Sequence, residues 1–96
     1  MADDIRMPVF QFTVEDVFSI AGRGVVVTGT VARGAVRVGE KLLLRQSDGK
    51  TIPIEITAIE GFKKILKEAL MGENVGLSIQ GLPKEAIRAG DTISFE

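Results

Sequence analysis

A run of β-branched residues around a glycine-flanked corner constrains this chain more than any other feature. Val17-Phe18 leads into the corner Ala21-Gly22-Arg23-Gly24, and Val25-Val26-Val27-Thr28 leaves it. β-Branched side chains are stiff at χ1 and suit a pleated, packed surface. The glycines at 22 and 24 permit the positive φ angles that a tight connection needs. The sequence therefore predicts two paired strands with Arg23 presented outward at the tip.

Short strand-like segments fill most of the remaining chain. Phe10, Phe12 and Val14 share one face of a first strand, and Glu15-Asp16 then interrupts the apolar run and predicts a bend. Asp48-Gly49 predicts a hairpin turn. Further strands are expected at residues 36–38, 41–45, 51–60, 75–80 and 91–95. Because Pro53 cannot donate a ladder hydrogen bond, we expect it at an edge or a bulge.

Residues 62–70 depart from this pattern. Their apolar side chains recur at helical spacing, at Phe62, Ile65, Leu66, Ala69 and Leu70. The local pattern therefore favours a helix there. A single helical turn stopped by Gly90 is also expected over residues 84–88.

Frequent turns between short, evenly spaced strands indicate a small β-barrel or sandwich rather than a parallel α/β sheet. The 96 residues fit one domain. We expect a flexible N-terminus over residues 1–7 and one folded domain over residues 8–96.

Composition excludes several function classes. The formal charge of −1 argues against a broad electrostatic footprint for duplex nucleic acid. The chain has no cysteine and no histidine, which removes disulfides, thiolate nucleophiles and the usual general base. No metal site, membrane span or secretory signal is expected, so a cytoplasmic protein is the default.

Several motifs in order along the chain resemble domain 2 of elongation factor Tu and related translational GTPases. They are residues 15–29, Arg33-Gly34, Val38-Gly39-Glu40, residues 59–66, residues 69–77 and residues 81–90. Ordered motifs over about residues 8–96 are far more specific than one glycine-rich turn. The resemblance implies an all-β fold, a small closed antiparallel barrel. It also implies strand and then loop over residues 62–70, which we adopt in place of the helix.

The resemblance also implies a binding role without catalysis. The chain contains no Gly-x-x-x-x-Gly-Lys-Ser/Thr phosphate loop, so we expect neither GTP hydrolysis nor a bound cofactor. In the full-length family, domain 2 helps to hold the aminoacylated end of transfer RNA. The positions that match this site are Glu15, Asp16, Phe18, Ile20, Glu60, Lys63 and Asn74. Glu60 matches the glutamate against which the terminal adenosine lies, and Asn74 matches a residue beside the aminoacyl group.

Each of these residues also has a purely structural interpretation. Burial in the core is favoured for Phe18 and Ile20, because aromatic and β-branched side chains are usually buried. A turn role is slightly favoured for Asn74. In the structural interpretation, Glu60 is an ordinary solvated carboxylate at a strand end. Gly22-Arg23-Gly24 is either an interaction tip or only a turn. The basic residues Arg33, Arg37, Lys41 and Arg45 are interpreted as a solvated face.

Two function hypotheses remain open. The first is a translation-related binding module that contacts the end of transfer RNA or a translation protein. The second is a structural or regulatory module that binds a protein through the Arg23 tip or an exposed strand edge. An enzyme is set aside, because the adjacent pair Glu15-Asp16 would point to opposite faces of a regular strand.

Overall fold

The computed structural model describes residues 9–95, which fold into one nine-stranded antiparallel sheet. The N-terminal segment predicted for residues 1–7 lies outside these described residues. The elements in chain order are β1 (Phe10–Thr13), β2 (Asp16–Ile20), β3 (Gly24–Arg37), β4 (Lys41–Arg45), β5 (Thr51–Gly61), β6 (Lys64–Leu66), β7 (Glu68–Leu70), β8 (Asn74–Gln80), the 3₁₀ turn η1 (Lys84–Ala86) and β9 (Thr92–Ser94).

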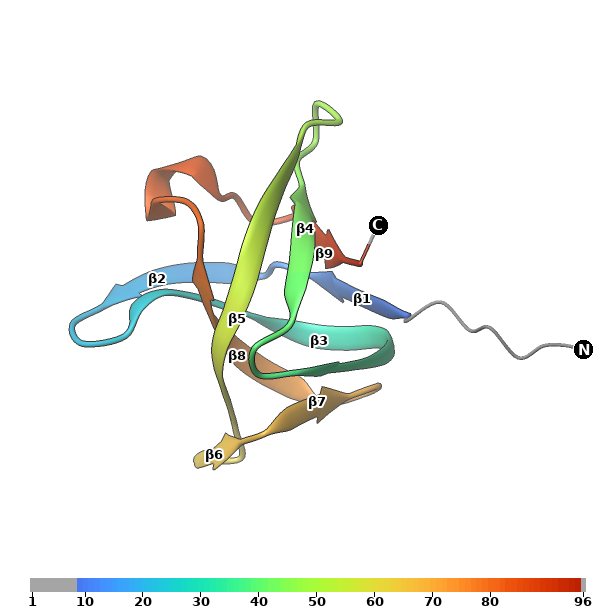
Figure 1. Ribbon diagram of the computed structural model, residues 1–96, viewed down its shortest axis with the longest axis vertical. Helices are drawn as coiled ribbons and strands as arrows, with labels where there is room; N and C mark the ends of the chain where they lie inside the picture. Colours follow the sequence, from blue (N-terminus) through green and yellow to red (C-terminus); the bar gives the residue numbers. More distant parts are fainter. Residues whose placement is uncertain (1–8, 96) are drawn as a thin grey trace, which may run out of the picture.

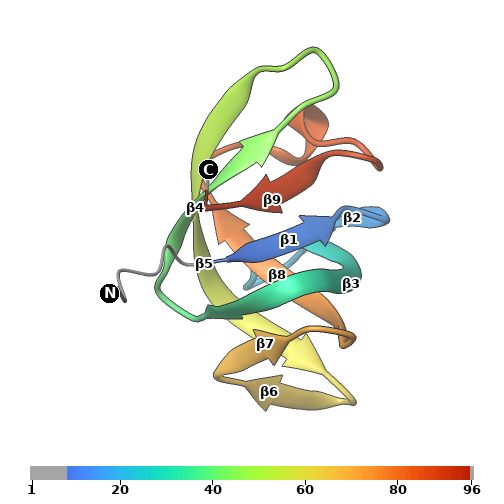
Figure 2. The ribbon, with the colours of Figure 1, turned by 90° about the vertical axis from the view of Figure 1, so that its right-hand side faces the viewer.

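Six of the strands close into a barrel. Their order is β1-β9-β4-β5-β8-β3, and β1 pairs with β3 to complete the ring. Three strands lie outside this ring: β2 pairs with β3, β6 with β5 and β7 with β3. The β2–β3 hairpin projects to the left of the barrel in Figure 1, and β6 and β7 form a short flap at the bottom of Figure 2. The predicted closed antiparallel β-barrel is therefore confirmed.

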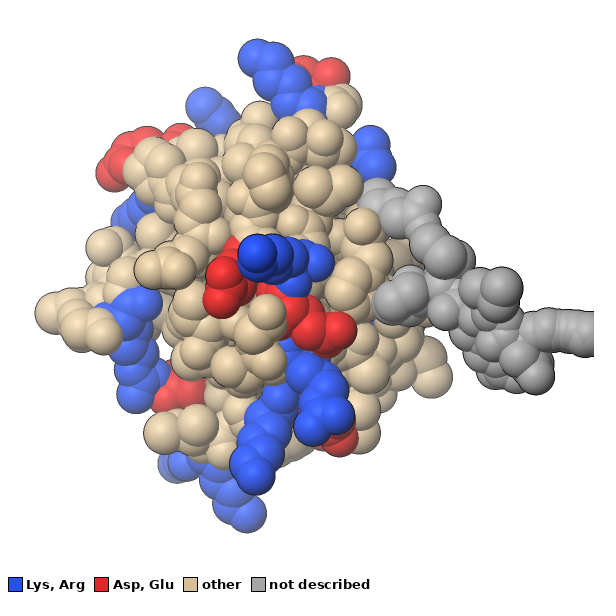
Figure 3. Space-filling model, in the orientation of Figure 1, with Lys and Arg blue, Asp and Glu red and all other residues tan. Residues whose placement is uncertain are grey.

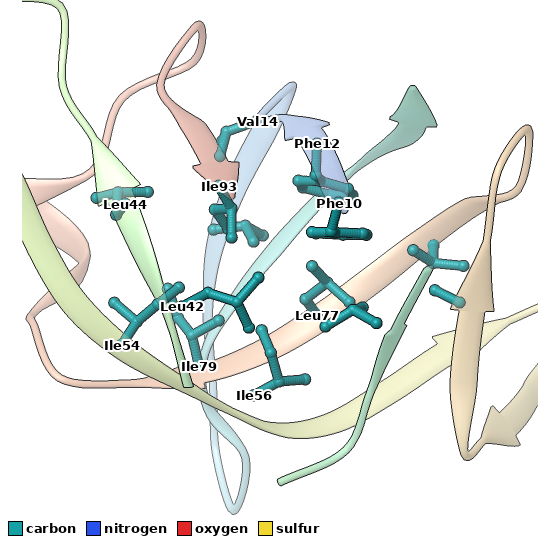
Figure 4. Close-up of a cluster of buried hydrophobic side chains, with 14 of the residues drawn as sticks. Phe10, Phe12, Val14, Leu42, Leu44, Ile54, Ile56, Leu77, Ile79 and Ile93 are labelled. Atoms are coloured by element: carbon teal, nitrogen blue, oxygen red, sulfur yellow. The ribbon is translucent and has the colours of Figure 1, made fainter. Parts of the chain in front are cut away.

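The barrel interior is a continuous apolar core. Phe10, Phe12 and Val14 are each almost fully buried, as their shared face predicts. The two phenyl rings stack with centroids 6.1 Å apart. Figure 4 shows the labelled side chains converging on one another from β1, β4, β5, β8 and β9. The alternation of inward and outward residues therefore places one face of each barrel strand on the core.

Close approach of β1 to β3 depends on a glycine. Gly34 pairs with Phe10 and has a φ of +70°, a left-handed conformation that suits glycine. A Cβ added to Gly34 would overlap the carbonyl oxygen of Val9. Since this oxygen belongs to the backbone, no side-chain rotation could relieve the overlap. Gly34 therefore lets β1 lie against β3 where the barrel closes.

The helix favoured by the local pattern of residues 62–70 is wrong, and the strand implied by the family resemblance is confirmed. β5 runs to Gly61, turns at Phe62-Lys63 and returns as β6, which pairs with β5. β7 then pairs with β3, where a loop was expected. Ladder pairing, of β6 with the adjacent β5 and of β7 with the distant β3, outweighs the helical spacing, because propensity is a weak preference that tertiary contacts override.

The turn between β5 and β6 holds two non-glycine residues in the left-handed region. Phe62 has a φ of 54° and Lys63 a φ of 60°. Positive φ at both central positions is the geometry of a type I′ turn, which favours asparagine and glycine. A left-handed conformation costs an ordinary L-residue about 1–2 kcal/mol. The turn is therefore strained.

Replacing Phe62 by asparagine should relieve part of this strain. We expect Phe62→Asn to raise the free energy of unfolding by about 0.5–1 kcal/mol, because asparagine tolerates the left-handed region. Phe62 is 67% exposed, so little apolar burial is lost. Urea denaturation measures the change. Phe62→Ala is the control, since alanine leaves the strain in place; equal stability of the two variants would contradict the strained turn.

The remaining turns agree with the sequence. Asp48-Gly49 closes the β4–β5 hairpin, where the Lys50 amide donates to Asp48 Oδ1 at 3.0 Å. The predicted helical turn is present as η1, but it ends at Ala86, before the Gly90 that was expected to stop it. Pro53 pairs with Leu43 on β4, and the pairing of β5 with β8 begins only at Glu55, so Pro53 lies at a free edge as expected.

Candidate functional site

The candidate residues gather on the outer face of the sheet formed by β2, β3, β8 and β5. Residues directly opposite each other in an antiparallel ladder share a face. One cross-strand row consists of Asp16, Thr28, Gly76 and Glu60. The neighbouring row consists of Phe18, Val26, Ser78 and Ala58. Gly76 and Ser78 on β8 and Ala58 on β5 are small, so the middle of this face is recessed.

Three of the candidate residues line one surface hollow of about 420 Å³, which we call the Asn74 hollow. They are Glu60 at the end of β5, Lys63 in the β5–β6 turn and Asn74 at the start of β8. Thr28 and Lys64 also line it. The hollow thus offers a carboxylate, two ammonium groups, an amide and a hydroxyl. This donor and acceptor set can bind a polar ligand that carries both hydroxyl groups and negative charge.

Arg23 reaches back from the hairpin tip to the same carboxylate. Its Nη1 forms an ion pair with Glu60 Oε1, and the two side chains are 43% and 37% exposed. An ion pair at this exposure contributes about 0–1 kcal/mol to stability. The sequence predicts that Arg23 points outward at the tip, and Arg23 is indeed exposed. The sequence does not predict the ion pair of Arg23 with Glu60.

Burial of Phe18 and Ile20 in the core, which the sequence favoured, is wrong. Phe18 is 46% exposed and Ile20 is 39% exposed. β2 lies outside the closed ring, so its side chains have no second sheet to cover them. Phe18 stands opposite Val26, which is buried on this outer face and does not belong to the core cluster. Phe18 and Val26 lie on the same face as Glu60, but neither of them lines the Asn74 hollow.

The other candidates are placed as follows. Asn74 is not a turn residue, because it begins β8 and its Nδ2 donates to Thr30 Oγ1 at 3.0 Å. The preceding turn is made by other residues, with Gly72 in the left-handed region. Asp16 lies in the cross-strand row of Glu60. Glu15 lies in the predicted bend between β1 and β2 and does not line the Asn74 hollow.

Sequence reasoning missed the small polar residues that make up the floor of this face. Thr28, Gly76 and Ser78 were not candidates, although each faces outward beside Glu60 or Ala58. A signal was present in β8, where Asn74, Gly76 and Ser78 alternate with the buried Val75, Leu77 and Ile79. Gly76 and Ser78, the small outward residues in the middle of β8, provide a flat surface there.

Other site classes gain no support from the described residues. Within residues 9–95, no cluster of acidic side chains could hold a metal ion. Over the same range, no helix has the length and apolar character needed to cross a membrane. Figure 3 shows basic and acidic side chains interspersed on one face rather than gathered into a single field. The basic residues Arg33, Arg37, Lys41 and Arg45 are all exposed, as expected.

Comparison with known proteins agrees with the barrel fold. The family model of elongation factor Tu domain 2 matches residues 24–94, and the chain belongs to this family. The chain is similar to the solved structure of the translation elongation factor SelB from Methanococcus maripaludis in its apo form. The sequences are 32% identical and the TM-score is 0.81. The match covers 99% of this chain and 20% of the SelB chain. The resemblance read from the motifs is therefore confirmed.

Proposed function

We propose that this chain is a non-catalytic, translation-related binding module of the cytoplasm that holds the single-stranded 3′ end of transfer RNA. The binding surface is the outer face of β2, β3, β8 and β5. The end of the RNA lies at the Asn74 hollow, with the terminal adenosine against Glu60, Asn74 beside the aminoacyl group and Lys63 close to the phosphate.

The observation that carries this proposal is the convergence of residues from separate segments. Glu60, Lys63 and Asn74 come from a strand end, a turn and a strand start, and they line one hollow. Phe18 and Ile20 are exposed on the same face, although burial is the usual state of such side chains. Exposed apolar side chains beside polar groups suit an unstacked base, which presents a flat apolar face and a polar edge.

The charge of the chain also fits a single-stranded end better than a duplex. A near-neutral chain cannot neutralise many phosphates, and duplex binding depends on many such contacts. Two lysines beside one hollow suffice for one or two phosphates.

A variant at Glu60 tests the proposal. We expect Glu60→Gln to weaken binding of a short single-stranded RNA with a 3′-terminal adenosine by about tenfold or more, because hydrogen bonds to charged groups contribute about 1.5–3 kcal/mol. Lys63→Ala should weaken it by a smaller factor that shrinks as salt concentration rises. Titration calorimetry with the purified chain measures both effects.

Glu68→Gln is the matched control, since Glu68 is an exposed glutamate on β7 that does not line the Asn74 hollow. Its affinity for the RNA should equal that of the unchanged protein. If Glu60→Gln and Lys63→Ala bind the RNA as tightly as Glu68→Gln and the unchanged protein do, the proposed site is refuted.

A further inference from the structure

The outer face centred on β9 lies across the barrel from the proposed RNA face. In the ring β1-β9-β4-β5-β8-β3, β9 and β8 stand at opposite positions, so their outer faces point in opposite directions. One cross-strand row on this face consists of Thr13 on β1, Thr92 on β9, Arg45 on β4 and Thr51 on β5. Along β1, β9 and β4 these residues alternate with buried ones, so they point outward. The row therefore places one guanidinium group among three hydroxyl groups.

A hollow of about 320 Å³ opens beside this row, and we call it the Arg45 hollow. Its polar lining residues are Thr13, Thr92 and Arg45, with Gln11 and Ser94 from the next cross-strand row. Residues directly opposite each other in an antiparallel ladder have Cβ atoms about 5 Å apart. The Thr92 hydroxyl and the Arg45 guanidinium can therefore reach the same ligand.

The charge of the Arg45 hollow has a single sign. Arg45 supplies a cation, and none of the lining residues is acidic. The Asn74 hollow differs, because Glu60 lines it beside two lysines. Among residues 9–95, Arg45 has no carboxylate as an ion-pair partner, and its neighbours across the ladders are threonines. The hollow therefore attracts an anion.

The hydrogen-bond donors of the hollow are available to such an anion. Within the part of the chain that the structure describes, the side chains of Gln11, Thr13 and Thr92 make no hydrogen bond to another residue. A guanidinium group binds two oxygen atoms of an oxyanion with its planar fork, and hydroxyl groups can donate to further oxygen atoms. A carboxylate presents both of its oxygen atoms to the fork, whereas a phosphate keeps others for the hydroxyl groups. The donor set thus suits phosphate better than carboxylate.

We propose that the Arg45 hollow binds the phosphate group of a small phosphomonoester. Arg45 takes two phosphate oxygen atoms, and the hydroxyl groups of Thr13 and Thr92 donate to the others. The volume of about 320 Å³ lies at the lower end of the range for small-molecule sites, which fits a phosphate with a small organic group. The hollow shares no residue with the proposed RNA face, so this inference goes beyond the proposed function and does not depend on it.

The test is an NMR titration of the isotope-labelled chain with glycerol 3-phosphate at constant ionic strength. We expect saturable shift changes at the backbone amides of Thr13, Arg45 and Thr92. Arg45→Gln should weaken binding by about tenfold or more, because hydrogen bonds between charged groups are the strong ones. Arg45→Lys should also weaken it, since lysine lacks the planar fork. Thr92→Val should weaken it by about threefold or more without loss of the fold, because valine suits a strand.

Matched controls separate the site from general electrostatic effects. Arg37 is an exposed arginine on β3 that does not line the Arg45 hollow, so Arg37→Gln should keep the full affinity. If Arg37→Gln weakens binding as much as Arg45→Gln does, net charge governs the effect and the proposed site is overturned. Acetate at the same ionic strength should bind more weakly than glycerol 3-phosphate. Equal affinities for the two anions would contradict the preference for phosphate.

Further outcomes decide between this site and its alternatives. If glycerol 3-phosphate shifts no resonance of the row, the row is only a solvated face and the proposal fails. If a short single-stranded RNA shifts the Arg45 amide and glycerol 3-phosphate does not, the hollow reads nucleic acid and the proposal also fails. Arg45→Gln should bind the RNA of the Glu60 experiment as tightly as the unchanged protein does. The failure of one site is therefore distinguishable from the failure of the other.

Discussion

Gly34→Ala should lower the free energy of unfolding by about 3–5 kcal/mol, which is a large part of the stability of a small domain. Two effects add. The left-handed φ of Gly34 costs an alanine about 1–2 kcal/mol. The new Cβ would also overlap the carbonyl oxygen of Val9, which forces β1 away from β3. Guanidinium denaturation followed by circular dichroism measures the loss.

Gly49→Ala is the matched control for this prediction. Gly49 also has a positive φ, of 90°, but a Cβ added there would meet no atom within 4 Å. We therefore expect only the conformational cost, about 1–2 kcal/mol. Equal losses in the two variants would contradict the close approach of β1 to β3 that closes the barrel.

Phe12→Ala should cost about 3–5 kcal/mol, the usual range for removing a fully buried aromatic side chain. Phe12 is 1% exposed and stacks on Phe10 in the centre of the core. Its removal leaves a cavity that the closed ring of strands cannot collapse to fill. The same denaturation experiment measures the change.

Phe18→Ala makes the same chemical change on the outer face. Because Phe18 is 46% exposed and packs only on one side of the sheet, we expect a loss of about 1 kcal/mol or less. A loss as large as that of Phe12→Ala would mean that β2 packs into the core. The small expected cost also makes Phe18→Ala a usable variant for binding experiments.

The barrel could be predicted from the sequence because its strands carry their pattern locally. The alternation of Phe10, Phe12 and Val14 fixes which face of β1 is buried, and the Asp48-Gly49 turn fixes the pairing of β4 with β5. Closure of the ring was implied by the family resemblance. It depends on the pairing of β1 with β3 and β9, which no local pattern contains.

Residues 62–70 show where local reasoning fails. Their apolar spacing fits a helix, yet Ile65 is 79% exposed and Ala69 is fully buried. β6 takes its hydrogen-bond partners from β5 across a tight turn, and β7 takes its partners from the distant β3. The strained turn at Phe62-Lys63 has no sequence signal, because neither residue favours a left-handed conformation.

The candidate site was only partly visible in the sequence. Glu60, Lys63 and Asn74 could be named from the family motifs, and the structure brings them together. The outward face of β2 could not be identified from the sequence, because the smaller Val17 packs against the core while Phe18 and Ile20 are exposed. The ion pair of Arg23 with Glu60 depends on the register of β3, β8 and β5. Register across distant strands is a tertiary property.

The most direct test of the central claim is an NMR titration of isotope-labelled protein with aminoacylated and with uncharged transfer RNA. We expect chemical-shift changes that cluster on the outer face, at Phe18, Ile20, Glu60, Lys63 and Asn74. Resonances of the residues near Asp48 at the β4–β5 turn should not move. An absence of shifts at high RNA concentration, or shifts centred on another face, would contradict the claim that this face binds the end of transfer RNA.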